Sequence, residues 1–127
     1  MIKVLVVDDD DLVRPTVSAM LREIDLEVSE TSSGKNALAL LSLNTFDLIV
    51  TDLFMPDFDG IELILRIRDL TSDTPIVLMT GGGRLFPPGS DGLDNLTTSA
   101  EYLGASYIIY KPFRKRELSE LVMKALS

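Results

Sequence analysis

The chain has 127 residues, of which 46% are hydrophobic, and this is the size and composition of one compact domain with its own core. Its formal net charge of -8 argues against direct binding to nucleic acid, because affinity for phosphate backbones comes from clustered Lys and Arg. The sequence has no Cys and no His, which argues against disulfides and soft-metal sites and leaves oxygen atoms as metal ligands.

Short apolar runs alternate with amphipathic segments along the chain, which is typical of repeated strand-helix units and a parallel sheet. The runs predict five strands, at residues 2–7, 26–30, 48–51, 76–80 and 107–110. Helical spacing predicts five helices, marked in chain order by Leu12, Leu21 and Ile24; by Ala37, Leu38 and Leu41; by Ile61, Ile64, Leu65 and Ile67; by Leu93, Leu96, Ala100 and Leu103; and by Leu118, Leu121, Val122 and Ala125. The fourth helix should end at Gly104, and the fifth should run over about 114–126.

The second predicted strand alternates polar and apolar residues like an exposed edge, whereas residues 4–7, 48–50 and 76–79 are continuously apolar, as in strands buried on both faces. An edge position for this strand fits the flavodoxin-like order 2-1-3-4-5 of a doubly wound, five-stranded parallel α/β sheet. In that order strands one and three are neighbours, and ligands bind beyond the carboxyl ends of the strands. We therefore expect one flavodoxin-like α/β domain over residues 1–127.

Polar residues follow the predicted strands at this ligand-binding edge. Asp8 and Asp9 come after strand one, Asp52 comes after strand three, and Thr80 ends strand four, while Lys111 follows strand five. Carboxylates held this close repel one another, and the hard cation Mg²⁺ is commonly held by carboxylates together with phosphate oxygens. A carboxylate nucleophile, Mg²⁺, a hydroxyl donor and an ammonium are the parts that phosphoryl transfer requires. The pattern therefore predicts a phosphate-handling magnesium site.

The same residues, read in order, resemble a known family. Residues 6–10 (Val-Val-Asp-Asp-Asp), residues 52–60 (Asp-Leu-Phe-Met-Pro-Asp-Phe-Asp-Gly), Thr80 and residues 111–113 (Lys-Pro-Phe) together resemble the receiver domain of two-component response regulators, in its single-domain, chemotaxis-regulator-like form. The resemblance covers essentially the whole chain. Each piece is common by itself, and the specificity lies in the ordered set at the ends of four strands.

The resemblance implies a role for each acidic residue of the set. Asp52 would be the phosphoacceptor and would also contact the metal. Asp9 would bind Mg²⁺ directly and Asp8 mainly through water, while the backbone carbonyl of Phe54 would complete the protein ligands. The resemblance thus implies Mg²⁺ as the cofactor.

The remaining residues and the partners also follow from the resemblance. Thr80 would bond the phosphoryl group, and Lys111 would pair with it, positioned by a cis peptide bond before Pro112. The donor would be a phosphohistidine on a sensor histidine kinase or a histidine phosphotransfer protein, necessarily another protein or domain because this sequence has no His. Phosphorylation would switch contacts with a downstream protein target or effector domain, and the domain would not be a turnover enzyme.

Other acidic residues have simpler interpretations. Asp10 and Asp11 are expected to cap the start of the first helix, where a negative charge meets the helix dipole. Asp57 and Asp59 are expected to make the loop polar and to cap the third helix. No apolar run is long enough for a signal peptide or a membrane span, so we expect a cytoplasmic protein without membrane insertion.

Three positions depart from the common receiver pattern. Ile108 stands where the family usually has Tyr or Phe, the side chain whose inward swing reports phosphorylation. Extra residues lie between Thr80 and Gly104, where the Gly and Pro content of residues 81–92 predicts a long loop. Phe54 would lie near the approach of a hydrolytic water. These departures keep open an alternative function, a phosphorylation-independent interaction module with the receiver fold, and the sequence leaves open whether the chain is a stand-alone receiver or a piece of a larger regulator.

Overall fold

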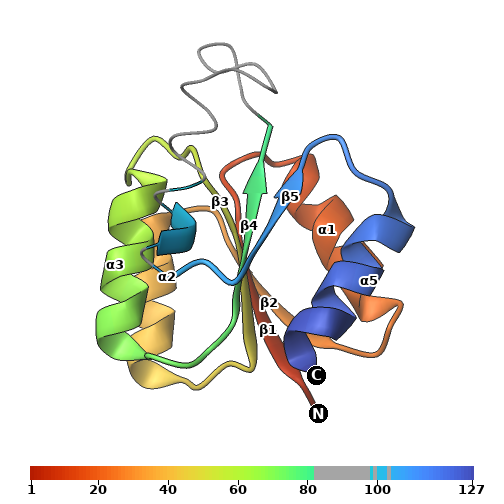
Figure 1. Cartoon of the computed structure of the whole chain (residues 1–127), viewed down its shortest axis with the longest axis horizontal. Helices are drawn as coiled ribbons and strands as arrows, with labels where there is room; N and C mark the ends of the chain where they lie inside the picture. The colour runs from red at the N-terminus through yellow and green to blue at the C-terminus, as the bar shows by residue number, and fades with distance from the viewer. Residues whose placement is uncertain (82–97, 99, 103) are drawn as a thin grey trace.

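A single sheet of five parallel strands forms the centre of the molecule (Figure 1). The computed structural model describes residues 1–81, 98, 100–102 and 104–127. The strand order is β2-β1-β3-β4-β5, and the strands are β1 (Lys3–Val7), β2 (Glu27–Thr31), β3 (Leu48–Asp52), β4 (Ile76–Thr80) and β5 (Tyr107–Tyr110). All five predicted strands are therefore found within one residue of their predicted bounds, and the second is at the edge as predicted.

Helices cover both faces of the sheet. Their bounds are α1 (Val13–Arg22), α2 (Gly34–Leu43), α3 (Gly60–Leu70) and α5 (Lys115–Leu126). Figure 1 shows α2 and α3 on one face and α1 and α5 on the other. Residues 98 and 100–102 are also helical, as predicted for the fourth helix, whose other residues lie outside the described part, as do residues 82–92 of the predicted loop. The flavodoxin-like fold class is confirmed.

The sheet divides the hydrophobic core into two clusters, because successive strand residues point to opposite faces. On one side Leu5 and Ile49 of the sheet pack with Leu63 of α3. On the other side Val6 and Val50 pack with side chains of α1 and α5. The strands β1, β3 and β4 contribute to both clusters, which explains why continuous apolar runs predicted the central strands correctly.

The ends of the first helix differ from the prediction, whereas the end of the fourth helix agrees with it. Leu12 and Ile24, predicted for the first helix, lie just outside α1, with Leu12 at the N-cap. Gly104 ends the fourth helix as predicted, with a φ of +136° and an N–H that donates to the Ala100 carbonyl at 3.1 Å. A Cβ at Gly104 would lie 2.7 Å from Nε of Arg68, so that this position excludes a side chain for two reasons.

Candidate functional site

The carboxyl ends of four strands bring the predicted site residues together. Asp8 follows β1, Asp52 is the last residue of β3, Thr80 is the last residue of β4, and Lys111 follows β5 directly. Nζ of Lys111 lies 3.0 Å from Oδ2 of Asp8 and 3.3 Å from Oδ1 of Asp52. The ammonium therefore bridges the ends of β1 and β3, and its two partners lie 103 and 59 residues away from Lys111 in the chain.

Three carboxylates form the acidic part of the site. One oxygen from each of Asp8, Asp9 and Asp52 lies within 4.8 Å of the others. Asp8 and Asp52 are buried, whereas Asp9 is exposed and helps to line a groove of about 570 Å³ that also includes Phe54. A partly accessible set of carboxylate oxygens is a fitting donor set for Mg²⁺, a hard cation that keeps part of its water shell.

Burial determines how readily the carboxylate of Asp52 ionises. Burial raises the pKa of Asp52 to about 6, against the opposing attraction of Lys111, and the neighbouring charge of Asp8 raises it further. Burial also disfavours the charged form of Lys111, but the attraction of Asp52 and Asp8 outweighs it and raises the pKa of the ammonium above its usual value. Lys111 therefore stays charged at neutral pH, and the carboxylates retain excess negative charge that a divalent cation would relieve.

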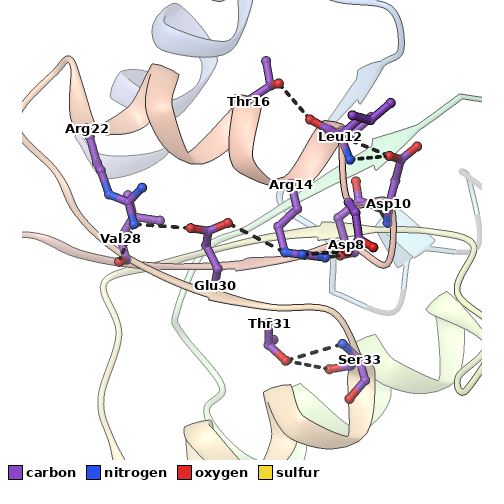
Figure 2. A network of polar contacts seen from close by, with 12 residues as sticks. Asp8, Asp10, Leu12, Arg14, Thr16, Arg22, Val28, Glu30, Thr31 and Ser33 are labelled. Carbon is purple, nitrogen blue, oxygen red and sulfur yellow. Dashed lines mark hydrogen bonds and ion pairs between the residues drawn. The ribbon is translucent and has the colours of Figure 1, made fainter.

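Asp8 is held at each of its polar groups. Its N–H donates to the Thr31 carbonyl at 3.1 Å, and its Oδ1 accepts the N–H of Asp10 at 2.9 Å. Nη1 of Arg14 donates to its backbone carbonyl at 2.9 Å, and Lys111 pairs with its Oδ2. Figure 2 shows Asp8 beside Asp10 and Arg14, between α1 and β2. The side chain is thus oriented by the Asp10 N–H and the ion pair with Lys111, while the backbone of Asp8 is held by Thr31 of β2 and Arg14 of α1.

Asp10 and Asp11, which follow the site residues Asp8 and Asp9, have different contacts. Oδ1 of Asp10 accepts the N–H groups of Leu12 at 2.8 Å and Val13 at 3.1 Å, which lowers the pKa of Asp10 and caps the start of α1 as predicted. Oδ1 of Asp11 pairs instead with Nη2 of Arg14 at 2.8 Å. Arg14 was not among the predicted residues, and its position three residues after Asp11 is the one sequence signal for this pair.

The structure also locates the other predicted site residues. Thr80 is fully buried, and its carbonyl accepts the N–H of Lys111 at 2.7 Å. The peptide bond between Lys111 and Pro112 is cis, as the resemblance implies. Phe54 follows β3 with 38% of its surface exposed, and its backbone forms an isolated antiparallel bridge with Asp59. The roles of Thr80 as phosphoryl donor contact and of the Phe54 carbonyl as metal ligand stay predictions.

One capping prediction for the loop before α3 is wrong. Asp59 caps α3, because its Oδ1 accepts the N–H of Ile61 at 2.8 Å. Asp57 does not; its two carboxylate oxygens accept the N–H groups of Gly34 at 3.2 Å and Lys35 at 3.1 Å, at the start of α2. The loop folds back toward α2, so the carboxylate meets unpaired N–H groups of a different helix. No local pattern in the sequence indicates a partner 23 residues away.

Ile108 and its neighbours on β5 point to the faces of the sheet that strand alternation predicts. Ile108 packs against the core cluster on the α2 and α3 side, whereas Tyr107 packs against the cluster on the α1 and α5 side. Tyr110 shares the face of Ile108 but is 44% exposed near the end of β5. The aliphatic side chain of Ile108 thus occupies the position where the family usually has an aromatic ring.

A doubly wound sheet of order 2-1-3-4-5, with an acidic cluster and a lysine at its carboxyl edge, defines the receiver class of domains. A family model described as the response regulator receiver domain matches residues 4–123, and the chain belongs to this family. It is 32% identical over 124 residues to the transcriptional regulatory protein SrrA of Staphylococcus aureus, an alignment that covers 98% of this chain and 47% of SrrA. The chain therefore spans about half the length of the curated relatives it matches.

Solved structures of similar proteins agree with this assignment. A CheY-like response regulator receiver domain protein from Methanospirillum hungatei superposes with a TM-score of 0.87 at 25% identity, over 99% of this chain and 94% of that one. The chemotaxis protein CheY4 of Vibrio cholerae superposes with a TM-score of 0.85 at 30% identity, over 99% of both chains. Within the described residues, no helix has the length and apolar character needed to span a membrane.

Proposed function

We propose that this receiver domain accepts a phosphoryl group on Asp52, in a Mg²⁺-dependent step of a two-component phosphorelay. The observation that carries the proposal is the grouping of three carboxylates within 4.8 Å, with Nζ of Lys111 bound to two of them. An acidic cluster alone has many uses. A partly buried acidic cluster with a lysine, in a domain of this family, is what phosphoryl transfer to a carboxylate needs.

In the proposed reaction an Asp52 oxygen attacks the phosphorus of a phosphohistidine on a partner protein. A P–O bond forms as the P–N bond breaks, and the imidazole nitrogen keeps the electron pair of the broken bond. The Lys111 ammonium, already beside Asp52, pairs with an oxygen of the incoming group, and the Thr80 hydroxyl donates to another. The domain thus assists its own phosphorylation and dephosphorylation. It is not a turnover enzyme, because each molecule modifies only its own acceptor.

The metal site follows from the same cluster. Asp9, which is exposed, would ligate Mg²⁺ directly, and buried Asp8 mainly through water, with Asp52 and the Phe54 carbonyl as the other protein ligands. When bound, Mg²⁺ supplies charge neutralisation for the acceptor carboxylate and the phosphoryl oxygens. The donor set fits this ion because all of the proposed protein ligand atoms are oxygen.

The proposed partners are a sensor histidine kinase or a histidine phosphotransfer protein upstream, and a protein target or effector domain downstream. The name of SrrA, a transcriptional regulatory protein, supports an output on transcription. The net charge of -8 argues that such an output acts through an effector and not through nucleic-acid binding by this domain. We further propose a cytoplasmic location, without membrane insertion, for a single receiver domain over residues 1–127.

A phosphorylation assay tests the proposal directly. The purified protein should gain one phosphoryl group from a small donor such as acetyl phosphate in the presence of Mg²⁺, and the label should be lost with EDTA and in Asp52→Ala. Asp69→Ala, which removes an exposed carboxylate on α3, is the matched control and should be labelled normally. Absence of label on the wild type would favour the phosphorylation-independent interaction module, and a pull-down comparing the wild type with Asp52→Ala would then identify its contacts.

A further inference from the structure

An arginine in the first turn of α1 connects three parts of the molecule and has no part in the proposed chemistry. Nη1 of Arg14 donates to the Asp8 carbonyl at 2.9 Å, Nη2 pairs with Oδ1 of Asp11 at 2.8 Å, and Nε lies 3.7 Å from Oε1 of Glu30 (Figure 2). Its side chain is only 17% exposed. Arg14 therefore links α1, the turn after β1 and the edge strand β2.

The charge of Arg14 has the wrong sign to attract a divalent cation, so electrostatics alone gives it no useful role at this site. Arg14 contacts the backbone carbonyl of Asp8 and not its carboxylate. The two carboxylate oxygens of Asp8 accept the N–H of Asp10 and a hydrogen bond from Lys111. That carbonyl belongs to the planar peptide that joins Asp8 to Asp9. A hydrogen bond to it therefore fixes the orientation of the peptide on which the exposed Asp9 carboxylate is carried.

We propose that Arg14 is a positioning residue for the metal site: it holds the Asp8–Asp9 peptide so that both carboxylates stay grouped with Asp52. Glu30 holds the guanidinium from the edge strand, and the Thr31 carbonyl holds the N–H of Asp8 from the same strand. Preorganised ligands bind a metal with a smaller loss of conformational freedom. The inference rests on the proposed Mg²⁺ binding of this site.

The chain contains a matched control for this residue. Arg22 lies on the same helix and contacts the same glutamate, with Nη2 3.4 Å from Oε2 of Glu30. The same nitrogen donates to the Val28 carbonyl at 3.4 Å, so its contacts are with β2. Replacing either arginine by Met removes one positive charge and one contact with Glu30, but only the change at Arg14 removes the bond to the Asp8 carbonyl.

The test compares Mg²⁺ affinity in the wild type, Arg14→Met and Arg22→Met, by calorimetric titration of metal-free protein whose folding is checked by thermal unfolding. Loss of a positive charge by itself strengthens Mg²⁺ binding, whereas loss of positioning weakens it. We expect about tenfold weaker binding in Arg14→Met, by analogy with residues that orient metal ligands. Arg22→Met should bind as tightly as the wild type or slightly more tightly. Binding by Arg14→Met as tight as in the wild type, or tighter, overturns the inference.

A second variant and a metal-independent measurement cover the case in which Arg14→Met folds poorly. Arg14→Lys keeps the charge, but a single ammonium cannot replace a guanidinium group whose three nitrogens reach three acceptors. Mg²⁺ binding should therefore weaken again. In metal-free protein, amide exchange at Asp10, whose N–H bonds to Asp8, should be faster in Arg14→Lys than in Arg22→Lys. Equal exchange together with unchanged Mg²⁺ affinity refutes the positioning role. A wild type that binds no Mg²⁺ refutes the proposed function itself, and the inference with it.

Discussion

Replacing the proposed acceptor by its neutral isostere, Asp52→Asn, should stabilise the metal-free protein at neutral pH. Burial raises the pKa of Asp52 from its ordinary 3.8 to about 6 in the folded protein. The folded state therefore holds the proton more tightly than the unfolded chain does. By linkage, the contribution of this group to the free energy of unfolding is greatest below about pH 4 and is lost as the pH rises toward 6.

The size of the effect follows from the gap between the two pKa values. About 2 pH units correspond to about 3 kcal/mol of unfolding free energy, which is the upper limit of the gain at neutral pH. Asn keeps an oxygen that can accept the N–H of Leu53, and the pKa of about 6 already includes the attraction of Lys111, which retains Asp8 as its partner. Because an amide replaces a protonated carboxyl imperfectly, we expect a net stabilisation on the order of 1–2 kcal/mol above pH 7.

Urea denaturation in EDTA, repeated from pH 4 to pH 8, measures this difference. The stability advantage of Asp52→Asn should grow between about pH 4 and pH 6 and then level off. Asp69→Asn, an exposed change of equal charge on α3, should show no such step. Mg²⁺ should stabilise the wild type more than Asp52→Asn, because ligand binding to the folded state adds to its stability. An advantage that does not change with pH, or a destabilised Asp52→Asn at pH 7.5, would refute the reasoning.

Three further changes give distinct expectations. Gly60→Ala should lower the free energy of unfolding by about 2 kcal/mol or more, because the added Cβ would lie 2.2 Å from the Leu53 carbonyl oxygen, and a normal melting temperature would contradict this. Asp57→Ala should cost about 1 kcal/mol and speed amide exchange at the start of α2, whose first two N–H groups it binds; Asp69→Ala is the control. Phe54→Asn should change the lifetime of the phosphorylated form, because a half-exposed apolar ring is replaced by an amide that can bond water. An unchanged dephosphorylation rate would dismiss the role of Phe54.

The sequence was a good guide to the sheet because the sheet is built from local patterns. Continuous apolar runs identify β1, β3 and β4, and the alternation in β2 places it at the edge, so that the strand order follows. The site was predictable to the same extent, since Asp8, Asp52 and Lys111 stand at the ends of strands. All three meet because parallel strands end at the same edge of the sheet.

The contacts that orient the site were less accessible to sequence reasoning. The carboxylate of Asp57 binds the start of α2 because the loop folds back, which depends on tertiary packing and not on neighbouring residues. The guanidinium group of Arg14 likewise reaches Asp8 and Glu30 through tertiary packing. The prediction began the first helix too early because the amphipathic spacing includes Leu12. In the structure Leu12 is only the N-cap of α1.

The ion pairs of Lys111 bear on how this domain exists before it meets any ligand. The ammonium is a covalently attached counterion, placed against two buried carboxylates by a backbone bond to the Thr80 carbonyl. It offsets part of the repulsion among the carboxylates, but one positive charge cannot balance three of them. Because this counterion is part of the chain, we expect newly made protein to reach its native state whatever the free magnesium concentration around it.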